Sequence, residues 1–325
     1  MLCSESWISQ NSDKSPEVLV EVLKQAYPQL RIPKFVNIPN NLFLKLLGIN
    51  QILGWVDIEN AYYSLLLHWA KNNSSKKEVS KLNSEFAEIK KYLEIYLSFV
   101  IESRGKSKIE LQYDKNVFSG LNLAAKNSVS TTDDLIVLNF NYTSTFQFYL
   151  DRYLNSKNPR NKEYAQINYI HGQLNSLNNP IIFGYGDERH RDFELVLQNG
   201  NNELLRNVKH YKYLQNTNLK ILMNFLDGHN GNISRQFDIH LIGHSCGNSD
   251  RALFNMIFEH PNLYKNGIKI HLADYEDEES KRLYYEDISI QISRTLNESG
   301  SVRTKLLNYQ DCLTMPSVEK LKSRV

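Results

Sequence analysis

The spacing of apolar residues changes near residue 133, and this change divides the chain into two regions. Before that point, apolar positions recur with the period of α-helices. From Leu135 onwards, short apolar runs alternate with longer amphipathic stretches, which predicts strands alternating with helices. We therefore expect a mostly helical region over residues 1–132 and an α/β region over residues 133–325.

A helical hairpin is predicted over about residues 55–104. Its second helix has apolar residues at steps of four and three, the stripe that a packed helix buries. That stripe consists of Leu82, Phe86, Ile89, Leu93, Tyr96 and Val100. Asn72-Asn73-Ser74-Ser75 supplies turn residues between the two helices. Aromatic residues at this spacing belong to a core far more often than to a cofactor site.

The α/β region is predicted to hold a mostly parallel sheet. The expected strands are at about residues 135–139, 166–170, 180–183, 237–242 and 267–272, and the expected helices are near 143–154, 203–227, 248–260 and 277–294. Strand–helix alternation is typical of parallel strands joined by helical crossovers. The fold class we expect is α/β, a Rossmann-like sheet with a helical N-terminal or inserted subdomain.

The first predicted strand ends in polar residues. The apolar run from Leu135 is followed by Asn139, Asn141 and Tyr142, and Thr143 or the next serine is the expected helix cap. Ligands of open parallel sheets bind outside the carboxyl ends of the strands, so these side chains would be delivered to the site. Taken alone, Asn141 is more simply explained as a turn residue.

Two later strands end in the same manner, in Ile170-His171-Gly172 and in Ile242-Gly243-His244-Ser245. Histidine suits proton transfer near neutral pH, and the glycine after His171 allows a sharp turn or a close approach to a ligand. A buried structural imidazole is the alternative for His171. We expect the three strand ends to meet, with Asn141 and His171 facing each other across a shared cleft.

The stretch after Gly243 leads into a helix, and the backbone N–H groups at a helix N-terminus form a ready anion site. Ser245, Asn248 or Ser249 could add donors to a phosphate there. Asp250 would favour a ribose hydroxyl over a phosphate through charge repulsion. The alternative is an ordinary helix cap, with Ser249 capping and Asp250 in the first turn.

The same stretch matches G-x-S-x-G, the pattern around the nucleophilic serine of α/β-hydrolases, here Ser245. That fold needs an acid and then a histidine later in the chain. No histidine follows Asp274, and His271 lies inside a predicted strand. An esterase is therefore the weakest alternative, to be tested with an acyl ester and Ser245→Ala.

Two further patterns carry less information. Phe183-Gly184-Tyr185-Gly186-Asp187 has two glycines but no G-x-G-x-x-G, so it predicts a turn beside the cleft. His240 and His244 are four residues apart, but on a strand that runs into a turn. They would not share a helical face, and we expect no metal site.

The net charge, the cysteines and the lengths of the apolar runs indicate which kinds of partner and compartment to expect. The formal net charge is only +2, which does not indicate a nucleic-acid or membrane surface. The three cysteines are far apart and form no CxxC pair, which fits a reducing compartment. No apolar run approaches the roughly 18 residues of a membrane span. We expect a cytoplasmic protein that contacts neither nucleic acid nor membrane.

Several motifs in this order resemble the AbiH family of bacterial abortive-infection proteins, over roughly residues 50–275. They are Phe140-Asn141-Tyr142-Thr143, Ile170-His171-Gly172, Ile182-Phe183-Gly184, and Ile242-Gly243-His244-Ser245 with Asp250. Trp55-Val56-Asp57-Ile58-Glu59 also resembles the tryptophan–acidic helix start of that family.

The family is similar to sirtuin-like NAD-binding proteins of antiphage defence, and this similarity implies a Rossmann-like NAD pocket. By position, Asn141 would hold the nicotinamide ribose and the attacking water, and His171 would be the general base. Gly243 and Ser245 would lie beneath the adenosine side. The implied nucleotide-binding residues are Asn139, Tyr142, Thr143, Gly184, Gly243, His244, Ser245 and Asp250.

The chain departs from the family at its start. AbiH proteins usually open with a strand and a Gly-Asn-Gly-Phe-Asp loop that resembles a pyrophosphate-binding turn. The first glycine here is Gly48, inside a predicted helix. We expect either a shortened N-terminus relative to the family or the loss of that half of the site.

The leading hypothesis is an antiphage defence protein that cleaves NAD to nicotinamide and ADP-ribose. Such cleavage passes through an oxocarbenium-like state and needs an oriented water and a proton acceptor. The alternative is a defence module without catalysis, which holds a nucleotide or contacts a phage component or partner protein. The sequence leaves the activating trigger, the natural substrate and homo-oligomerisation open.

Overall fold

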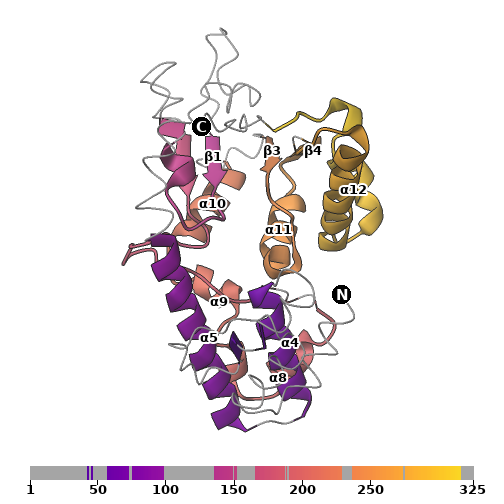
Figure 1. Cartoon of the computed structure of the whole chain (residues 1–325). Helices are drawn as coiled ribbons and strands as arrows, with labels where there is room; N and C mark the ends of the chain where they lie inside the picture. Colours follow the sequence, from indigo (N-terminus) through magenta and orange to yellow (C-terminus); the bar gives the residue numbers. More distant parts are fainter. Residues whose placement is uncertain are drawn as a thin grey trace. The chain divides into compact units, whose positions relative to one another are not determined.

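A computed structural model describes residues 42–43, 45–46, 57–72, 75–98, 135–148, 150–151, 165–186, 188, 190–228, 236–273 and 275–315. The chain divides into two compact units (Figure 1). The first unit consists of Met1–Ile95 and Phe183–Tyr211, and the second of Tyr96–Ile182 and Lys212–Val325. The predicted boundary near residue 132 stays a prediction, because it falls outside the described residues.

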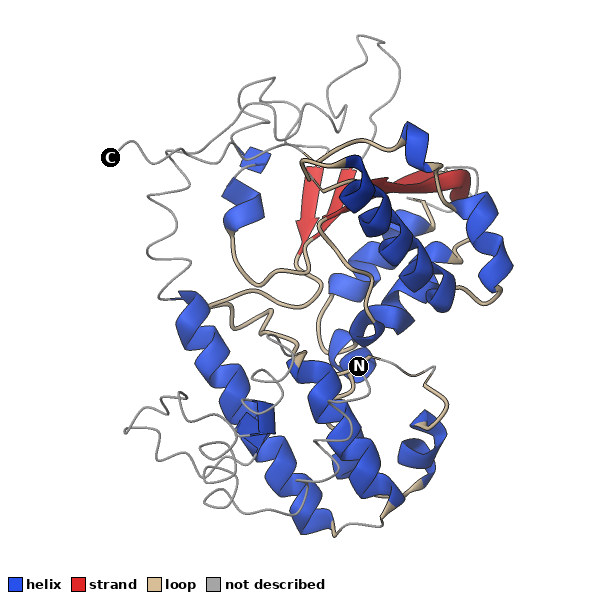
Figure 2. Ribbon diagram, turned by 45° about the vertical axis from the view of Figure 1, so that its right-hand side comes forward, coloured by secondary structure: helices blue, strands red, loops and turns tan. Residues whose placement is uncertain are grey.

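The first unit is built on the predicted hairpin. Its helices are α4 (Ile58–Lys71) and α5 (Lys76–Tyr96), which lie side by side in both views (Figures 1 and 2). The ring of Tyr62 stacks on Phe86 at 4.0 Å, and its hydroxyl donates to Asn83 Oδ1 at 2.5 Å. Both helices therefore face one core, as the apolar spacing predicted.

Local caps explain where these two helices begin. Asp57 Oδ1 accepts the N–H of Asn60 at 3.0 Å, which satisfies one of the open donors of α4. At the start of α5, the Ser75 N–H donates to Glu78 Oε2 at 2.7 Å, and the Glu78 N–H donates to Ser75 Oγ at 3.3 Å. This reciprocal pair is a capping box.

The second stretch of the first unit contains α8 (Phe193–Gln198), η4 (Asn202–Leu205) and the start of α9 (Lys209–Tyr213). The prediction of one helix over 203–227 was therefore wrong. Between η4 and α9 the chain turns and Val208 forms an isolated bridge with Tyr185: the Tyr185 N–H donates to the Asn207 carbonyl at 3.0 Å, and the Lys209 N–H donates to the Tyr185 carbonyl at 2.7 Å.

Asparagine side chains bond to the backbone at the starts of two of these short helices. Asn201 Oδ1 accepts the N–H of Glu203, and Asn216 Oδ1 accepts the N–H of Asn218. The Asn216 bond lies inside the stretch predicted as one helix and gives the backbone there an alternative to helical pairing. The next helix is α10 (Asn218–Leu226), which belongs to the second unit.

The second unit holds two parallel strand pairs. β1 (Leu135–Leu138) pairs with β2 (Ala165–Asn168), and β3 (Phe237–Ile242) pairs with β4 (Leu263–His271). Figure 2 shows these strands in red. The protein is thus a mixed α/β protein, and its described strands form two two-stranded parallel sheets. Strand β4 begins earlier than the predicted residue 267.

Residues 180–183 are not a strand, which corrects the prediction for this segment. Their polar backbone groups bond to loop atoms instead of a ladder. The Ile182 N–H donates to the His171 carbonyl at 2.7 Å, and the Tyr142 hydroxyl donates to the Ile182 carbonyl at 3.3 Å. Pro180 has no N–H to offer to a sheet.

Two of the remaining predicted helices of the second unit are present. η6 (Asn248–Asp250) and α11 (Arg251–Phe258) lie where a helix near 248–260 was expected, and α12 (Glu278–Thr295) lies where one near 277–294 was expected. Three short helices that were not predicted follow: η7 (Ser299–Ser301), α13 (Val302–Lys305) and η8 (Tyr309–Asp311). The helix expected from residue 143 is described as helical at 145–148 and 150–151. Its first bond runs from the Phe148 N–H to the Ser144 carbonyl at 3.1 Å, which makes Ser144 the cap.

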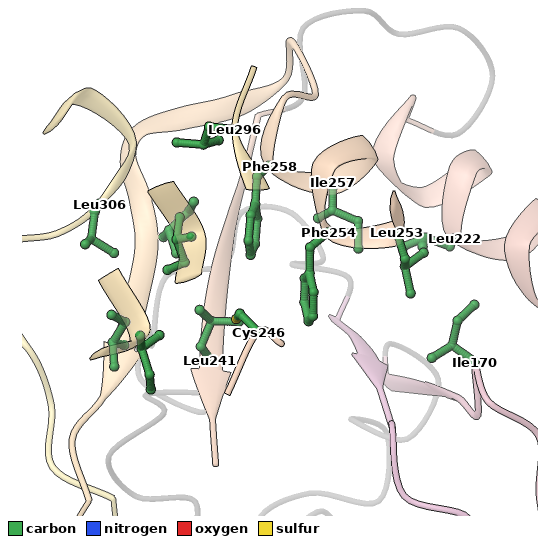
Figure 3. Close-up of a cluster of buried hydrophobic side chains, with 14 of the residues drawn as sticks. Ile170, Leu222, Leu241, Cys246, Leu253, Phe254, Ile257, Phe258, Leu296 and Leu306 are labelled. Carbon is green, nitrogen blue, oxygen red and sulfur yellow. The ribbon is translucent and has the colours of Figure 1, made fainter. Parts of the chain in front are cut away.

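One hydrophobic cluster joins both strand pairs of the second unit. It contains Leu241 of β3, Ile268 and Ile270 of β4 and the apolar face of α11, and Leu138 and Phe140 pack against it. Figure 3 shows Phe254 and Phe258 beside each other on α11, with Cys246 next to Leu241. The segments that follow β1 and β3 therefore share one core.

In the part of the chain that the structure describes, no helix is long and apolar enough to cross a membrane.

Candidate functional site

The ring of Phe140, which follows β1, is surrounded by residues from other strand ends. It meets the imidazole of His171 edge-on, with centroids 5.0 Å apart and planes at 86°. The ring of His244, which follows β3, lies 4.3 Å away, and Phe254 of α11 stacks at 5.2 Å. Side chains that follow β1, β2 and β3 thus come together in the second unit.

Asp250 lies between two of these imidazoles. Its Oδ1 is 3.0 Å from His171 Nε2, and its Oδ2 is 3.8 Å from His244 Nε2. Asp250 is 7% exposed and His171 is 5% exposed, so the contact between them is shielded from water. We call His171, Asp250 and His244 the His–Asp–His cluster.

Backbone turns place the two histidines. Gly172 has φ +85, and a Cβ there would lie 2.2 Å from the Pro180 carbonyl oxygen, so only glycine fits after His171. Gly243 has φ +66 and Cys246 has φ +53, which turn the chain sharply after β3. The Cys246 N–H donates to His244 Nδ1 at 2.9 Å and so orients that ring.

Asn139 and Asn141 have different surroundings, although both follow β1. Asn139 Oδ1 accepts the N–H of Asn141 at 3.0 Å. Asn139 is 5% exposed, and its Nδ2 has no hydrogen-bond partner among the residues that the structure describes, whereas Asn141 is exposed. The His171 ring is near the rings of Phe140, Tyr213 and Tyr142, the last with centroids 6.4 Å apart, and its Nε2 lies beside the Asp250 carboxylate.

The sequence of this chain matches a known protein family. The family described as "Bacteriophage abortive infection AbiH" matches residues 7–271, which include the whole His–Asp–His cluster. The chain belongs to the AbiH family. It is therefore an abortive-infection antiphage protein by family. No curated protein and no solved structure matches this AbiH chain.

The remaining predicted binding residues of this AbiH protein lie in several places. Tyr142 is bonded to the Ile182 carbonyl, and the Thr143 hydroxyl lies 3.2 Å from that of Thr145. Gly184 belongs to the first unit, where its N–H donates to Glu59 Oε1 at 2.9 Å. The acidic residue of the predicted tryptophan–acidic helix start thus fixes the turn at Gly184.

Ser245 of the AbiH chain is exposed, and it is the next residue, Cys246, that has the left-handed backbone conformation. In an α/β-hydrolase the nucleophilic serine itself occupies the strained turn. Cys246 is 1% exposed, and burial, followed by the charge of Asp250, raises the pKa of its thiol to about 12. Neither residue has the geometry of an activated nucleophile.

Within the described ranges, no group of three or more histidine, cysteine, aspartate or glutamate side chains is placed to hold a metal ion. His240 Nδ1 lies 2.8 Å from His271 Nε2, across the β3–β4 pair.

Sequence reasoning selected His171, His244 and Asp250 but missed two features of the site. It did not identify Phe140, whose ring contacts both imidazoles. It also did not foresee that Asp250 would face His171 rather than open space. An apolar residue between two asparagines at a strand end was the only available signal for Phe140. The roles of all these residues remain predictions.

Proposed function

We propose that this AbiH-family protein is an NAD glycohydrolase, which splits NAD into nicotinamide and ADP-ribose and so stops an infected cell together with its phage. The observation that carries the proposal is the His–Asp–His cluster, a carboxylate between two imidazoles where three strand ends meet. Buried acid–imidazole pairs are typical of proton-transfer sites.

NAD cleavage needs a proton acceptor and a group that orients water, and a histidine and an asparagine can fill these two roles. The bond between ribose C1′ and the nicotinamide nitrogen breaks, and its electron pair neutralises the pyridinium ring. Water bonds to C1′ and loses a proton, while positive charge develops on the ribose. In the proposal, His171 takes the proton and Asn141 orients the water and the ribose hydroxyls.

Two features of the chain fit a nucleotide. Asn139 offers a buried amide donor that has no partner within the described part of the chain, and a hydroxyl or phosphate oxygen could remove the cost of that open donor, about 1–3 kcal/mol. A Cβ at Gly243 would meet no described residue within 4 Å, so the backbone there has room beside it. Gly243 and Ser245 would support the nucleotide, and a Rossmann-like arrangement of the parallel strands is part of this proposal.

Nicotinamide release from NAD by the purified full chain is the direct test. We expect release in the wild type and a loss of about 10²- to 10⁴-fold in kcat for His171→Ala. Asn141→Ala should also lower the rate, because water and ribose would lose their orientation. Release that is unchanged in both variants would remove these residues from the mechanism.

A second candidate is a defence module that binds a nucleotide, or a phage component or partner protein, without catalysis. It is favoured by the burial of His171 and Asp250, which are each less than one-tenth exposed. Calorimetry with NAD and ADP-ribose separates the two candidates. Binding without nicotinamide release supports this second candidate, and turnover excludes it.

A further inference from the structure

We infer that Asp250 is the positioning residue of this site, and that it fixes the His171 ring so that Nδ1, rather than Nε2, is the nitrogen that accepts a proton. The inference rests on the proposed function for its catalytic meaning. Its structural content, the tautomer of His171, can be measured without any substrate.

The first step is the placement of the His171 ring. Nε2 is enclosed by protein, and it lies 3.0 Å from Asp250 Oδ1. The two atoms are within hydrogen-bonding distance but do not form an aligned hydrogen bond, which is common before a ligand tightens a catalytic site. A proton on Nε2 is attracted by the carboxylate, and a reactant could not reach that nitrogen. Nδ1 is the nitrogen left for chemistry.

The second step is that aromatic rings hold the same orientation. Tyr213 lies parallel to the His171 ring, with centroids 6.1 Å apart and planes at 8°. Phe140 meets the ring nearly at a right angle. The imidazole is thus restrained on a face and at an edge, while the carboxylate determines which nitrogen carries the proton.

The third step is the role of His244. Its Nδ1 accepts the N–H of Cys246, so the proton of the neutral ring must be on Nε2. That nitrogen faces Asp250 Oδ2 at 3.8 Å. The second carboxylate oxygen is therefore directed at His244, which keeps Oδ1 directed at His171. The Asp250 carboxylate is thus positioned between the imidazoles of His171 and His244.

The chemistry follows from this arrangement. As water bonds to ribose C1′, its proton moves to His171 Nδ1, and the nicotinamide nitrogen takes the electron pair of the broken bond. The imidazolium that forms carries a proton on each nitrogen, and the Asp250 carboxylate balances its charge. An aspartate that orients a catalytic histidine in serine proteases acts in the same manner, and its exchange for asparagine gives the wrong tautomer.

Asp250→Asn is the informative variant, because it keeps the size of the side chain. We expect the amide to donate to His171 Nε2, which moves the ring proton to Nδ1 and blocks the base. The matched control is Asp287→Asn, the same exchange at an exposed carboxylate of α12. Unfolding curves would show whether both variants keep the fold.

Nitrogen NMR of the histidine rings, recorded on the full chain without NAD, reads the tautomer directly. We expect the Nε2–H form of His171 in the wild type and in Asp287→Asn, and the Nδ1–H form in Asp250→Asn. An Nδ1–H form in the wild type, or signals of His171 that are the same in Asp250→Asn, would overturn the inference.

Nicotinamide release then tests the catalytic meaning. We expect Asp250→Asn to lower kcat about 10²- to 10⁴-fold with little change in KM, because the substrate still binds but the base is occupied. A loss that appears only in KM would overturn the positioning role. If the wild type releases no nicotinamide, the proposed function fails, while the NMR result still decides the Asp250–His171 relationship separately.

Discussion

Lys209 Nζ lies 2.7 Å from Glu59 Oε2 in the interior of the first unit. The Lys209 side chain is 2% exposed and that of Glu59 is 14% exposed. The other oxygen of the same carboxylate accepts the N–H of Gly184. One glutamate of α4 therefore holds two segments of the second stretch of this unit in place.

Breaking this ion pair should destabilise the protein strongly. Lys209→Met leaves the Glu59 carboxylate in the interior without its cation, and we expect a loss of about 3–5 kcal/mol in the free energy of unfolding. Urea denaturation measures this loss. The control is Lys71→Met, which removes an ion pair with Asp192 whose lysine is 48% exposed. That change should cost less than about 1 kcal/mol, and equal losses in both variants would contradict the argument.

Stability should fall on acidification because of His271. Burial, then the neighbouring His240 and Lys269, lowers the pKa of His271 from 6.5 to about 4. Between pH 6.5 and pH 4, His271 therefore binds a proton in the unfolded chain but not in the folded protein. The stability that is present above pH 6.5 is lost as the pH falls towards 4. The shift corresponds to about 3 kcal/mol.

Thermal melts at several pH values between 4 and 7 measure the effect of His271. The variant His271→Gln cannot titrate there, so its melting temperature should depend less on pH than that of the wild type. His240, whose pKa is also lowered by burial, contributes in the same direction. An identical pH dependence in the wild type and in His271→Gln would rule out this source.

Gly172→Ala should be much more damaging than Gly200→Ala. Both positions have positive φ, +85 and +78, so alanine is strained at each by about 1–2 kcal/mol. Only at Gly172 would the new Cβ collide with backbone, 2.2 Å from the Pro180 carbonyl oxygen. We expect a further loss of about 1–3 kcal/mol there, measured by denaturation. Similar melting curves for both variants would show that the backbone at Pro180 moves to make room for the new Cβ.

Cys246 should resist alkylation in the folded protein. The thiolate is the reactive form, and the pKa of about 12 leaves very little of it at pH 8. Cys312, whose pKa is raised by burial to about 11, should also react slowly. Mass spectrometry after iodoacetamide treatment can compare both peptides, with protein in urea as the reference. Rapid native labelling of Cys246 would refute the buried, inert thiol.

The helical hairpin could be predicted from sequence because its information is local. Leu82, Phe86 and Ile89 are all buried, as their spacing predicted. Tyr96, at the far end of the same predicted stripe, is exposed. Apolar spacing gives the face of a helix, but it does not tell how far along that face a partner extends.

The errors lie where non-local contacts decide the structure. Residues 180–183 have the composition of a strand, but their hydrogen bonds go to the His171 and Tyr142 segments. The predicted helix from residue 203 was interrupted by pairing between Tyr185 and Val208. Likewise, His171 and Asp250 were each selected by their local motifs, but their contact depends on how three strand ends pack.

The division of the first unit between two stretches has a consequence for biosynthesis. Glu59 leaves the ribosome well before Gly184, which is 125 positions later. During translation, the α4–α5 hairpin is therefore synthesised before the second stretch of the unit, against which it packs in the folded protein. A nascent chain that is released before Phe183 would lack the second stretch of that unit. Premature termination should thus yield polypeptides that chaperones and proteases recognise, because the apolar surface that the second stretch covers stays exposed.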